Sequence, residues 1–271
     1  MKKLLNNSEL QTVSLDEIRS AIRRGFFHGH TSGLAKGKLQ GNLMVLPKDF
    51  AEDFMRFCLA NSKPCPLIAI GDVGSPLLPS LGIDLDIRTD IPAYNVYRDG
   101  QYSESLSDIT DLWSDDWVAF VLGCSFTFEA ALDAAKVPLS HLNSNKNVSM
   151  YRTTVKTVSE GMFEADLVVS MRPIPKHQKQ LVIQICEQFP FAHGAPCHWG
   201  CPQDIGIENL ECPDWGDVIE VKEDEVPAFW ACGVTTQLAL QTAAPPIAIS
   251  HKPGSMLITD VDNADAKLIE I

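Results

Sequence analysis

The sequence contains no apolar run long enough to cross a membrane and no secretory signal at its start. A membrane-spanning helix needs about 20 consecutive apolar residues, and no segment of the 271-residue chain approaches that length. The first residues, MKKLLNNSELQ, lose their apolar character after two leucines, unlike a signal peptide. Eight cysteines at irregular spacings indicate reduced thiols rather than a disulfide framework. We therefore expect a cytoplasmic protein that does not contact a membrane.

Positive charge is scarce as well. The chain has 22 Lys and Arg against 35 Asp and Glu, a formal net charge of −13, which disfavours nucleic acid and anionic membranes as partners. The sequence also lacks GxGxxG and the phosphate loop GxxxxGKS or GxxxxGKT, so nothing predicts a bound nucleotide, and we expect no cofactor. An anionic substrate would meet a repulsive global field, and each arginine in apolar surroundings is therefore informative.

Apolar strands followed by helices recur along the chain. The capping-box spacing of Ser14 and Glu17 predicts a helix that ends near Gly25. Hydrophobic patterning predicts the following further elements: strands at 42–47, 66–72, 117–123, 165–173 and 226–233, helices at 47–61 and 125–137 and after 173 and 233, and a hairpin at 246–260. This alternation predicts an α/β fold with sheets covered on both faces.

The stretch HGHTSGLAKGKLQGN, residues 28–42, has a glycine at every fourth position from 29 to 41. In a helix each glycine would cost roughly 0.8–1 kcal/mol relative to alanine, so we predict a loop. Glycine allows backbone N–H groups to approach a ligand closely, and the side chains of His28, His30, Thr31 and Ser32 add polar groups. A plain connector with two surface histidines is the alternative.

Nine further segments follow one another along the chain: GLAKGKLQGNLMVLP, IRTDIPAYNVYRDG, FVLGCSFTFEAAL, NVSMYRT, VVSMRPIP, HGAPCHWG, GIENL, PDWGD and VPAFWACGVTTQ. Together they resemble a bacterial hydro-lyase family that is related to the D-glutamate cyclase of animal mitochondria. The resemblance runs from about residue 20 to residue 262. It implies a three-layer α/β/α domain, expected at 1–145 and 233–271, and a smaller α+β domain at 146–232.

The resemblance also implies a lyase that eliminates water from a small carboxylate substrate. The leading reaction is the cyclisation of D-glutamate to 5-oxo-D-proline. Two other functions stay open: a non-catalytic module that binds a carboxylate metabolite, and a hydroxy-acid dehydratase, which would need a base for an acidic C–H group. Assembly into a homo-oligomer is left open too.

Cyclisation requires residues that bind the substrate carboxylate. Three arginines inside the matching segments are candidates because a guanidinium can bind a carboxylate with two hydrogen bonds: Arg88, Arg152 and Arg172. A structural ion pair, to Asp90 or another acid, is the alternative for each. The helix start after Gly123 could hold an anion through its N–H groups, with Ser125 as a substrate contact or an ordinary cap.

The reaction also requires an acid and a base, for which Asp90 and His193 are the candidates. Histidine needs the least pKa tuning to move protons near neutrality, although either residue could simply be buried and hydrogen-bonded. Cys124 stands at a helix start, where thiol pKa values fall. A thioester from a free carboxylate is strongly uphill without a nucleotide, so we expect Cys124 to pack or to donate a hydrogen bond.

Five polar residues are further candidates for holding the substrate: Thr31, Ser32, Asn42, Asn147 and Tyr151. The cysteines and histidine of CHWGC allow one other possibility. Cys197, His198 and Cys201, with Cys212, could bind zinc, but their spacing is not that of a standard zinc knuckle and packing cysteines are the simpler interpretation.

Overall fold

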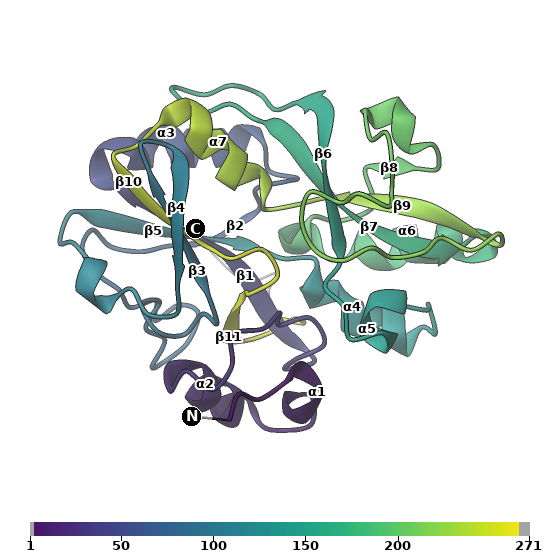
Figure 1. Cartoon of the computed structure of the whole chain (residues 1–271), viewed down its shortest axis with the longest axis horizontal. Helices are drawn as coiled ribbons and strands as arrows, with labels where there is room; N and C mark the ends of the chain where they lie inside the picture. The colour runs from purple at the N-terminus through teal and green to yellow at the C-terminus, as the bar shows by residue number, and fades with distance from the viewer. Residues whose placement is uncertain (1–2, 266–271) are drawn as a thin grey trace.

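The computed structural model describes residues 3–265, which form two β-sheets that lie side by side (Figure 1). The larger sheet has seven strands in the order β2-β5-β1-β10-β3-β4, with β11 also paired to β1. The smaller sheet has four strands in the order β6-β7-β9-β8. Every pairing between strands is antiparallel.

The strands of the larger sheet are β1 (Lys38–Pro47), β2 (Leu67–Ile70), β3 (Tyr94–Arg98), β4 (Gln101–Leu106), β5 (Trp117–Gly123), β10 (Ile247–His251) and β11 (Leu257–Asp262). Those of the smaller sheet are β6 (Ser149–Lys156), β7 (Asp166–Pro175), β8 (His198–Trp199) and β9 (Glu225–Ala231). The α-helices are α1 (Asn7–Leu10), α2 (Leu15–Arg23), α3 (Lys48–Ala60), α4 (Phe126–Ala134), α5 (Ser140–Asn143), α6 (Lys179–Cys186) and α7 (Thr235–Ala243).

The predicted three-layer α/β/α domain is wrong, because both sheets are antiparallel and each carries helices on one face. Helices α3 and α7 pack on one face of the larger sheet. Its other face is covered by irregular chain, through side chains such as Leu78, Leu85 and Ile91. The smaller sheet repeats this arrangement, with α4 and α6 on one face and loop residues such as Ile205 and Ile219 on the other. The division into two domains at 145/146 and 232/233 stays a prediction.

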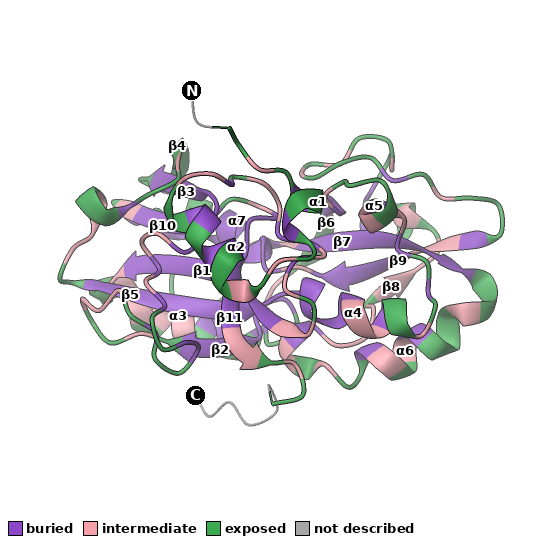
Figure 2. Ribbon diagram, turned by 90° about the horizontal axis from the view of Figure 1, so that it is seen from below, coloured by how far each residue is buried: buried purple, intermediate pink, exposed green. Residues whose placement is uncertain are grey.

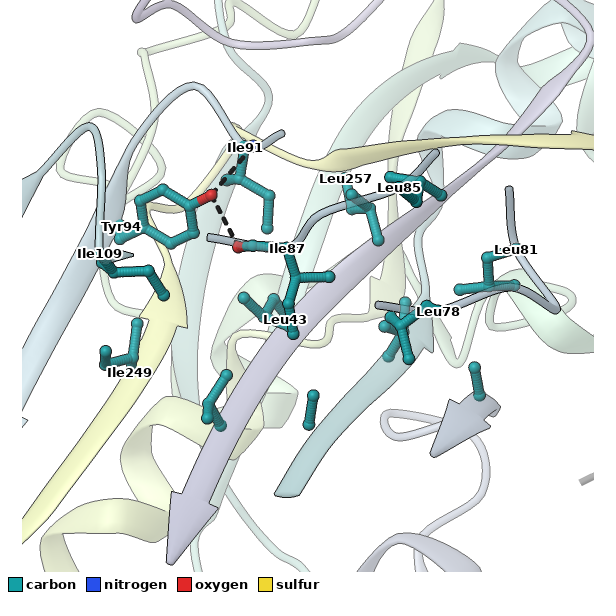
Figure 3. Packing of buried hydrophobic residues seen from close by; sticks show 14 of the residues in the cluster. Leu43, Leu78, Leu81, Leu85, Ile87, Ile91, Tyr94, Ile109, Ile249 and Leu257 are labelled. Atoms are coloured by element: carbon teal, nitrogen blue, oxygen red, sulfur yellow. Dashed lines mark hydrogen bonds between the residues drawn. The ribbon is translucent and has the colours of Figure 1, made fainter. Parts of the chain in front are cut away.

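Irregular chain can cover the larger sheet because its buried polar groups find partners. The Tyr94 hydroxyl accepts a hydrogen bond from the Ile91 N–H at 3.1 Å and donates one to the Ile87 carbonyl at 2.8 Å (Figure 3). Tyr94 and both isoleucines are fully buried. The Tyr94 hydroxyl thus pairs with two backbone groups of the loop, which would otherwise be buried without a hydrogen-bond partner.

Several sequence predictions of single elements are confirmed. Ser14 and Glu17 form the expected capping box and open α2, and Gly25 follows the helix with φ +65°. Gly33 and Gly37 also have positive φ and lie in the predicted loop, whereas Gly41 lies inside β1. The predicted C-terminal hairpin is wrong: β10 and β11 do not pair with each other but both pair with β1.

Most strands are buried along most of their length, whereas the edge strand β4 is exposed, and further exposed residues lie on helices and loops (Figure 2). No helix within residues 3–265 is long and apolar enough to cross a membrane.

Candidate functional site

A cleft of about 790 Å³ lies where the two sheets meet. Seven segments line it: the glycine loop at 28–30, the strands β3 and β4, the helix α7, the turn at 252–255, residue 147 and residues 215–217. We call this cavity the cleft. Its size is that of a typical small-molecule site, and such sites often form where structural units meet.

Hydrogen bonds join the segments that form the rim of the cleft. The Thr31 N–H donates to the Gly254 carbonyl at 2.8 Å, and the Ser255 hydroxyl donates to the Gly29 carbonyl at 3.1 Å. Gly254 has φ +93°, and a Cβ there would lie 2.4 Å from Asn147 Nδ2. The glycine loop and the 252–255 turn are therefore held together, and glycine is required at 254 to admit Asn147.

Neutral polar side chains in the cleft are held in fixed orientations. The Tyr97 hydroxyl donates to Gln237 Oε1 at 2.9 Å, and Gln237 Nε2 donates to the His251 carbonyl at 2.9 Å. On β3, Asn95 Oδ1 accepts a hydrogen bond from Ser105 at 2.7 Å. These bonds fix the orientation of the amides of Asn95 and Gln237, which both line the cleft.

Besides the phenols of Tyr97 and Tyr102, the titratable groups that line the cleft are His28, His30, Lys252 and Asp217. Burial lowers the pKa of His30 below its usual value of 6.5, so its imidazole is neutral near pH 7. Lys252 is exposed and supplies a cation. Asp217 also lines the cleft, and its Oδ2 accepts a hydrogen bond from the Asn147 N–H at 2.8 Å. The cleft thus combines a cation, a neutral base and a carboxylate.

A second cluster of charged side chains lies outside the cleft and is almost fully buried. Glu129 on α4 is 2% exposed and Arg172 on β7 is 1% exposed. Arg172 Nη2 donates to Glu129 Oε1 at 2.6 Å and to Ser125 Oγ at 3.0 Å. The Ser32 hydroxyl donates to Glu129 Oε2 at 3.0 Å, and His141 Nε2 lies 2.8 Å from Glu129 Oε1. Three predicted site residues, Ser32, Ser125 and Arg172, thus meet around a glutamate that the sequence analysis did not select.

This charged cluster keeps Glu129 ionised. Burial raises the pKa of Glu129, but the nearby His141 and Arg172 lower it by more than burial raises it, and the resulting pKa is about 2. Ser125 is at the N-cap position of α4, but its side chain does not cap the helix and instead accepts the hydrogen bond from Arg172.

Asp90, one of the two acid–base candidates, and Arg88, a predicted carboxylate ligand, lie on the loop between β2 and β3. Asp90 is 1% exposed and accepts hydrogen bonds from Arg23 Nη2 at 2.7 Å and from the Asp86 N–H at 3.0 Å. Arg88 pairs with Asp86 at 2.6 Å. Both side chains have protein partners and neither lines the cleft. Their roles toward a substrate stay predictions.

His193, the other acid–base candidate, lines a separate cavity of about 440 Å³ near Cys58, Lys63 and Cys65. Its Nδ1 lies 2.9 Å from the Lys63 carbonyl, and burial lowers its pKa to about 4.

Cys124 packs against apolar side chains in the core beside Phe126 and Val234. Burial raises the pKa of its thiol to about 12, so the thiolate is scarce at neutral pH.

Arg152 and Tyr151 line a third cavity, of about 660 Å³, on the smaller sheet. Arg152 Nη2 pairs with Asp166 Oδ2 at 2.5 Å, and the Tyr151 hydroxyl donates to the Leu210 carbonyl at 2.6 Å. Substrate binding by this pair stays a prediction, since the cavity is not the cleft.

The remaining substrate-binding candidates differ in their relation to the cleft. Asn147 lines it. Thr31 is buried and donates to Gln40 Oε1 at 2.7 Å, so it supports the rim from behind. Asn42 is buried on β1, where its Nδ2 donates to the Gly123 carbonyl at 2.7 Å.

The possible zinc ligands do not converge. Cys197 donates to the Phe229 carbonyl, and His198 Nε2 lies 2.7 Å from the Cys201 carbonyl. Cys212 lines the third cavity on the smaller sheet. Within residues 3–265, no three His, Cys, Asp or Glu side chains are grouped closely enough to hold a metal ion.

Sequence reasoning missed Glu129, His141, Asp217, Gln237 and Lys252. Glu129 follows the strand–helix turn of FVLGCSFTFEAAL by only a few residues, and an acid flanked by apolar residues was the available signal. Asp217 and Lys252 stand in loops, and no sequence pattern relates their positions to the glycine loop.

Comparison with known proteins identifies the class first. The chain is 54% identical over 252 residues to a protein of Dinoroseobacter shibae named "Putative hydro-lyase", covering 93% of this chain and 84% of the relative. A relative in Verminephrobacter eiseniae with the same name is 53% identical, and the match covers 92% of this chain and 91% of the relative. A third relative, in Cupriavidus taiwanensis, is 52% identical, and the match covers 91% of this chain and 92% of the relative. The chain therefore belongs to a family of hydro-lyases, which are carbon–oxygen lyases.

The family is that of D-glutamate cyclase, whose model matches residues 118–260. This confirms the resemblance seen in the sequence. Among solved structures, a nitrogen repressor-like protein from Methanococcus jannaschii aligns with 89% of this chain and 96% of its own, at 11% identity and a TM-score of 0.39.

Proposed function

We propose that the cleft binds D-glutamate and converts it to 5-oxo-D-proline with loss of water. The observation that carries the proposal is the grouping of Lys252, His30 and Asp217 around one cavity of about 790 Å³, in a chain of the D-glutamate cyclase family. A cation in the cleft supplies local attraction for a carboxylate, although the chain as a whole is acidic, at −13.

In this proposal Lys252 and the amides of Asn95 and Gln237 bind the substrate carboxylates, and Asp217 attracts the ammonium group. The neutral imidazole of His30 accepts a proton from that ammonium group. The freed amine then attacks the side-chain carboxyl carbon. A C–N bond forms and a C–O bond breaks. The nitrogen gives up two protons in all, and the departing oxygen takes up two and leaves as water.

No nucleotide is needed because the attacking nitrogen and the carboxyl carbon belong to one molecule. Well-oriented intramolecular reactions reach effective molarities on the order of 10⁵ M or more, which lowers the barrier by about 7 kcal/mol. The cleft would supply that orientation by holding the substrate folded. The proposal includes no cofactor and sets the reaction in the cytosol.

Purified protein, D-glutamate and a nucleotide-free buffer suffice for the test. The expected result is 5-oxo-D-proline in a chiral assay, with much less lactam from L-glutamate. If folded protein binds glutamate but forms no lactam from either enantiomer, the cyclase proposal is wrong. A panel of hydroxy acids followed by NMR then separates a dehydratase, which releases water, from a binding module, which yields only a ligand-dependent rise in melting temperature.

A further inference from the structure

The buried charged cluster touches the segment that forms one wall of the cleft. Its members come from four segments that are distant in sequence: Ser32 in the glycine loop, Glu129 on α4, His141 on α5 and Arg172 on β7 (Figure 1). Burying charges is costly, and an apolar replacement of similar volume is often at least as stable. Stability alone is therefore a weak reason for this arrangement.

The two oxygens of Glu129 have different partners. Oε1 accepts hydrogen bonds from Arg172, from Nη2 at 2.6 Å and Nε at 3.2 Å, and His141 Nε2 lies 2.8 Å away. Because an ionised carboxylate only accepts, the proton of the His141 ring must be on Nε2. Oε2 is left to accept the Ser32 hydroxyl at 3.0 Å. One oxygen is thus anchored to β7 and α5, and the other holds the glycine loop.

Ser32 is two residues beyond His30, and the chain between them is fixed on several sides. Asn7 Nδ2 donates to the His30 carbonyl at 2.8 Å and to the Ser32 carbonyl at 3.1 Å. The Thr31 N–H is bonded to the Gly254 carbonyl at 2.8 Å. With its backbone held in this way, the loop presents His28, Gly29 and His30 to the cleft.

We propose that Glu129 is a positioning residue for the cleft, which acts through Ser32 to hold the loop that carries His30. The inference rests on the proposed function of His30 as proton acceptor. Arg172 and His141 hold the carboxylate of Glu129 at the position from which it reaches Ser32. Displacement of a reacting group by about 1 Å can lower a rate by about a hundredfold, so the loss of this support should reduce turnover without removing substrate contacts.

The least disruptive test is Ser32→Ala, which removes one hydroxyl and leaves the Glu129–Arg172 pair intact. The expected result is a fall in kcat of about ten- to a hundredfold with KM changed by less than about threefold, and recovery of most of kcat in Ser32→Thr. The matched control is Lys36→Met. It removes an ion pair of 3.2 Å between the same loop and the same helix, from Lys36 to Asp133, in which both side chains are 60% exposed. This control should leave kcat unchanged.

Amide hydrogen exchange of residues 29–33, measured without substrate, separates this inference from the proposed reaction. Faster exchange in Ser32→Ala but not in Lys36→Met supports the positioning role, even if the wild-type protein forms no lactam. If amide exchange and kcat in Ser32→Ala equal those of the wild type, the inference is wrong. It is also wrong if amide exchange becomes faster while kcat stays unchanged. Should Ser32→Ala not fold, Glu129→Gln with its control Asp133→Asn gives the same comparison.

Discussion

The carbonyl oxygen of Phe191 lies so close to Gly123 that a Cβ at residue 123 would be 1.5 Å from it. Gly123 ends β5 of the larger sheet, and Phe191 lies in the short 3₁₀-helix Pro190–Ala192, which follows α6. The obstacle is a backbone atom, which cannot rotate away as a side chain can. The contact between these two segments therefore requires glycine at this position.

Gly123→Ala should consequently lower the free energy of unfolding by about 3 kcal/mol or more, at the upper end of the usual cost of overpacking. Gly71→Ala is the matched control. A Cβ there would lie 3.3 Å from the flexible Leu78 Cδ2 and at ordinary contact distance, 3.5–3.6 Å, from Ala119, so the change should cost less than about 1 kcal/mol. Urea denaturation of both variants measures the difference. Equal stabilities would show that the chain near Phe191 moves freely.

Arg172 and Arg152 should respond differently to replacement by methionine. Arg172→Met leaves Glu129 buried with its main cation removed and should cost about 3–5 kcal/mol. Arg152 is half exposed, with 53% of its side chain accessible, and Arg152→Met should cost no more than about 1 kcal/mol. Denaturation curves and calorimetric titration with glutamate test both variants. Loss of glutamate binding at unchanged stability would instead support the sequence-based assignment of these arginines as carboxylate ligands.

Stability should fall as the pH is lowered from 6.5 toward 4. Burial lowers the pKa of both His193 and His251 from 6.5 to about 4, so in this range the unfolded chain binds protons that the folded chain does not. Each histidine then lowers the free energy of unfolding by on the order of 1.4 kcal/mol per pH unit. Above pH 6.5 neither histidine makes the free energy of unfolding depend on pH. Glu129, with its pKa lowered from 4.5 to about 2, contributes stability that is fully present above pH 4.5 and is lost as the pH falls from 4.5 through about 2.

Thermal unfolding of His251→Gln between pH 7.5 and 4 tests this expectation, with the exposed His177→Gln as the control. The His251 variant should show a shallower loss of stability with acid, and the control should follow the wild type. Parallel curves for all three proteins would show that His251 does not contribute to the pH dependence.

Cys124→Ser should keep turnover within about threefold of the wild type, because burial raises the pKa of the thiol to about 12 and a protonated thiol is a poor nucleophile. Steady-state kinetics and intact-mass spectrometry during turnover provide the measurement. A folded but inactive variant, together with an acyl adduct on the wild-type thiol, would establish covalent catalysis instead.

The sequence identified single elements well and their assembly poorly, for a physical reason. The capping box of Ser14 and Glu17 acts within one helical turn, so it could be recognised without knowing the fold. The run WVAFVLG at 117–123 is buried on both faces. Such continuous apolar runs are typical of parallel strands, but here irregular chain covers the second face and the strand is antiparallel. Coverage by a loop leaves no periodic signal.

The same limit applies to the site. Arg172 and Ser125 were selected because their residue types suit anions, yet Arg172 is paired with Glu129 and Ser125 is bonded to Arg172. Lys252 and Asp217 become neighbours of the glycine loop only through the Gly254–Thr31 and Asn147–Asp217 hydrogen bonds. Contacts of such long range in sequence cannot be read from one chain.

Lys252→Met should raise the KM for D-glutamate. A hydrogen bond to a charged group contributes about 1.5–3 kcal/mol, so we expect a change of about ten- to a hundredfold, with kcat less affected because Lys252 binds the carboxylate in both ground and transition state. Lys179→Met removes an equally exposed cation, which lies over Trp199 away from the cleft, and should leave KM unchanged. Since Lys252 is exposed, the wild-type KM should also rise with ionic strength, whereas that of the Lys252 variant should hardly respond. If KM shows the same salt dependence in both variants and the wild type, the substrate carboxylate is bound elsewhere, and the third cavity beside Arg152 becomes the site to examine.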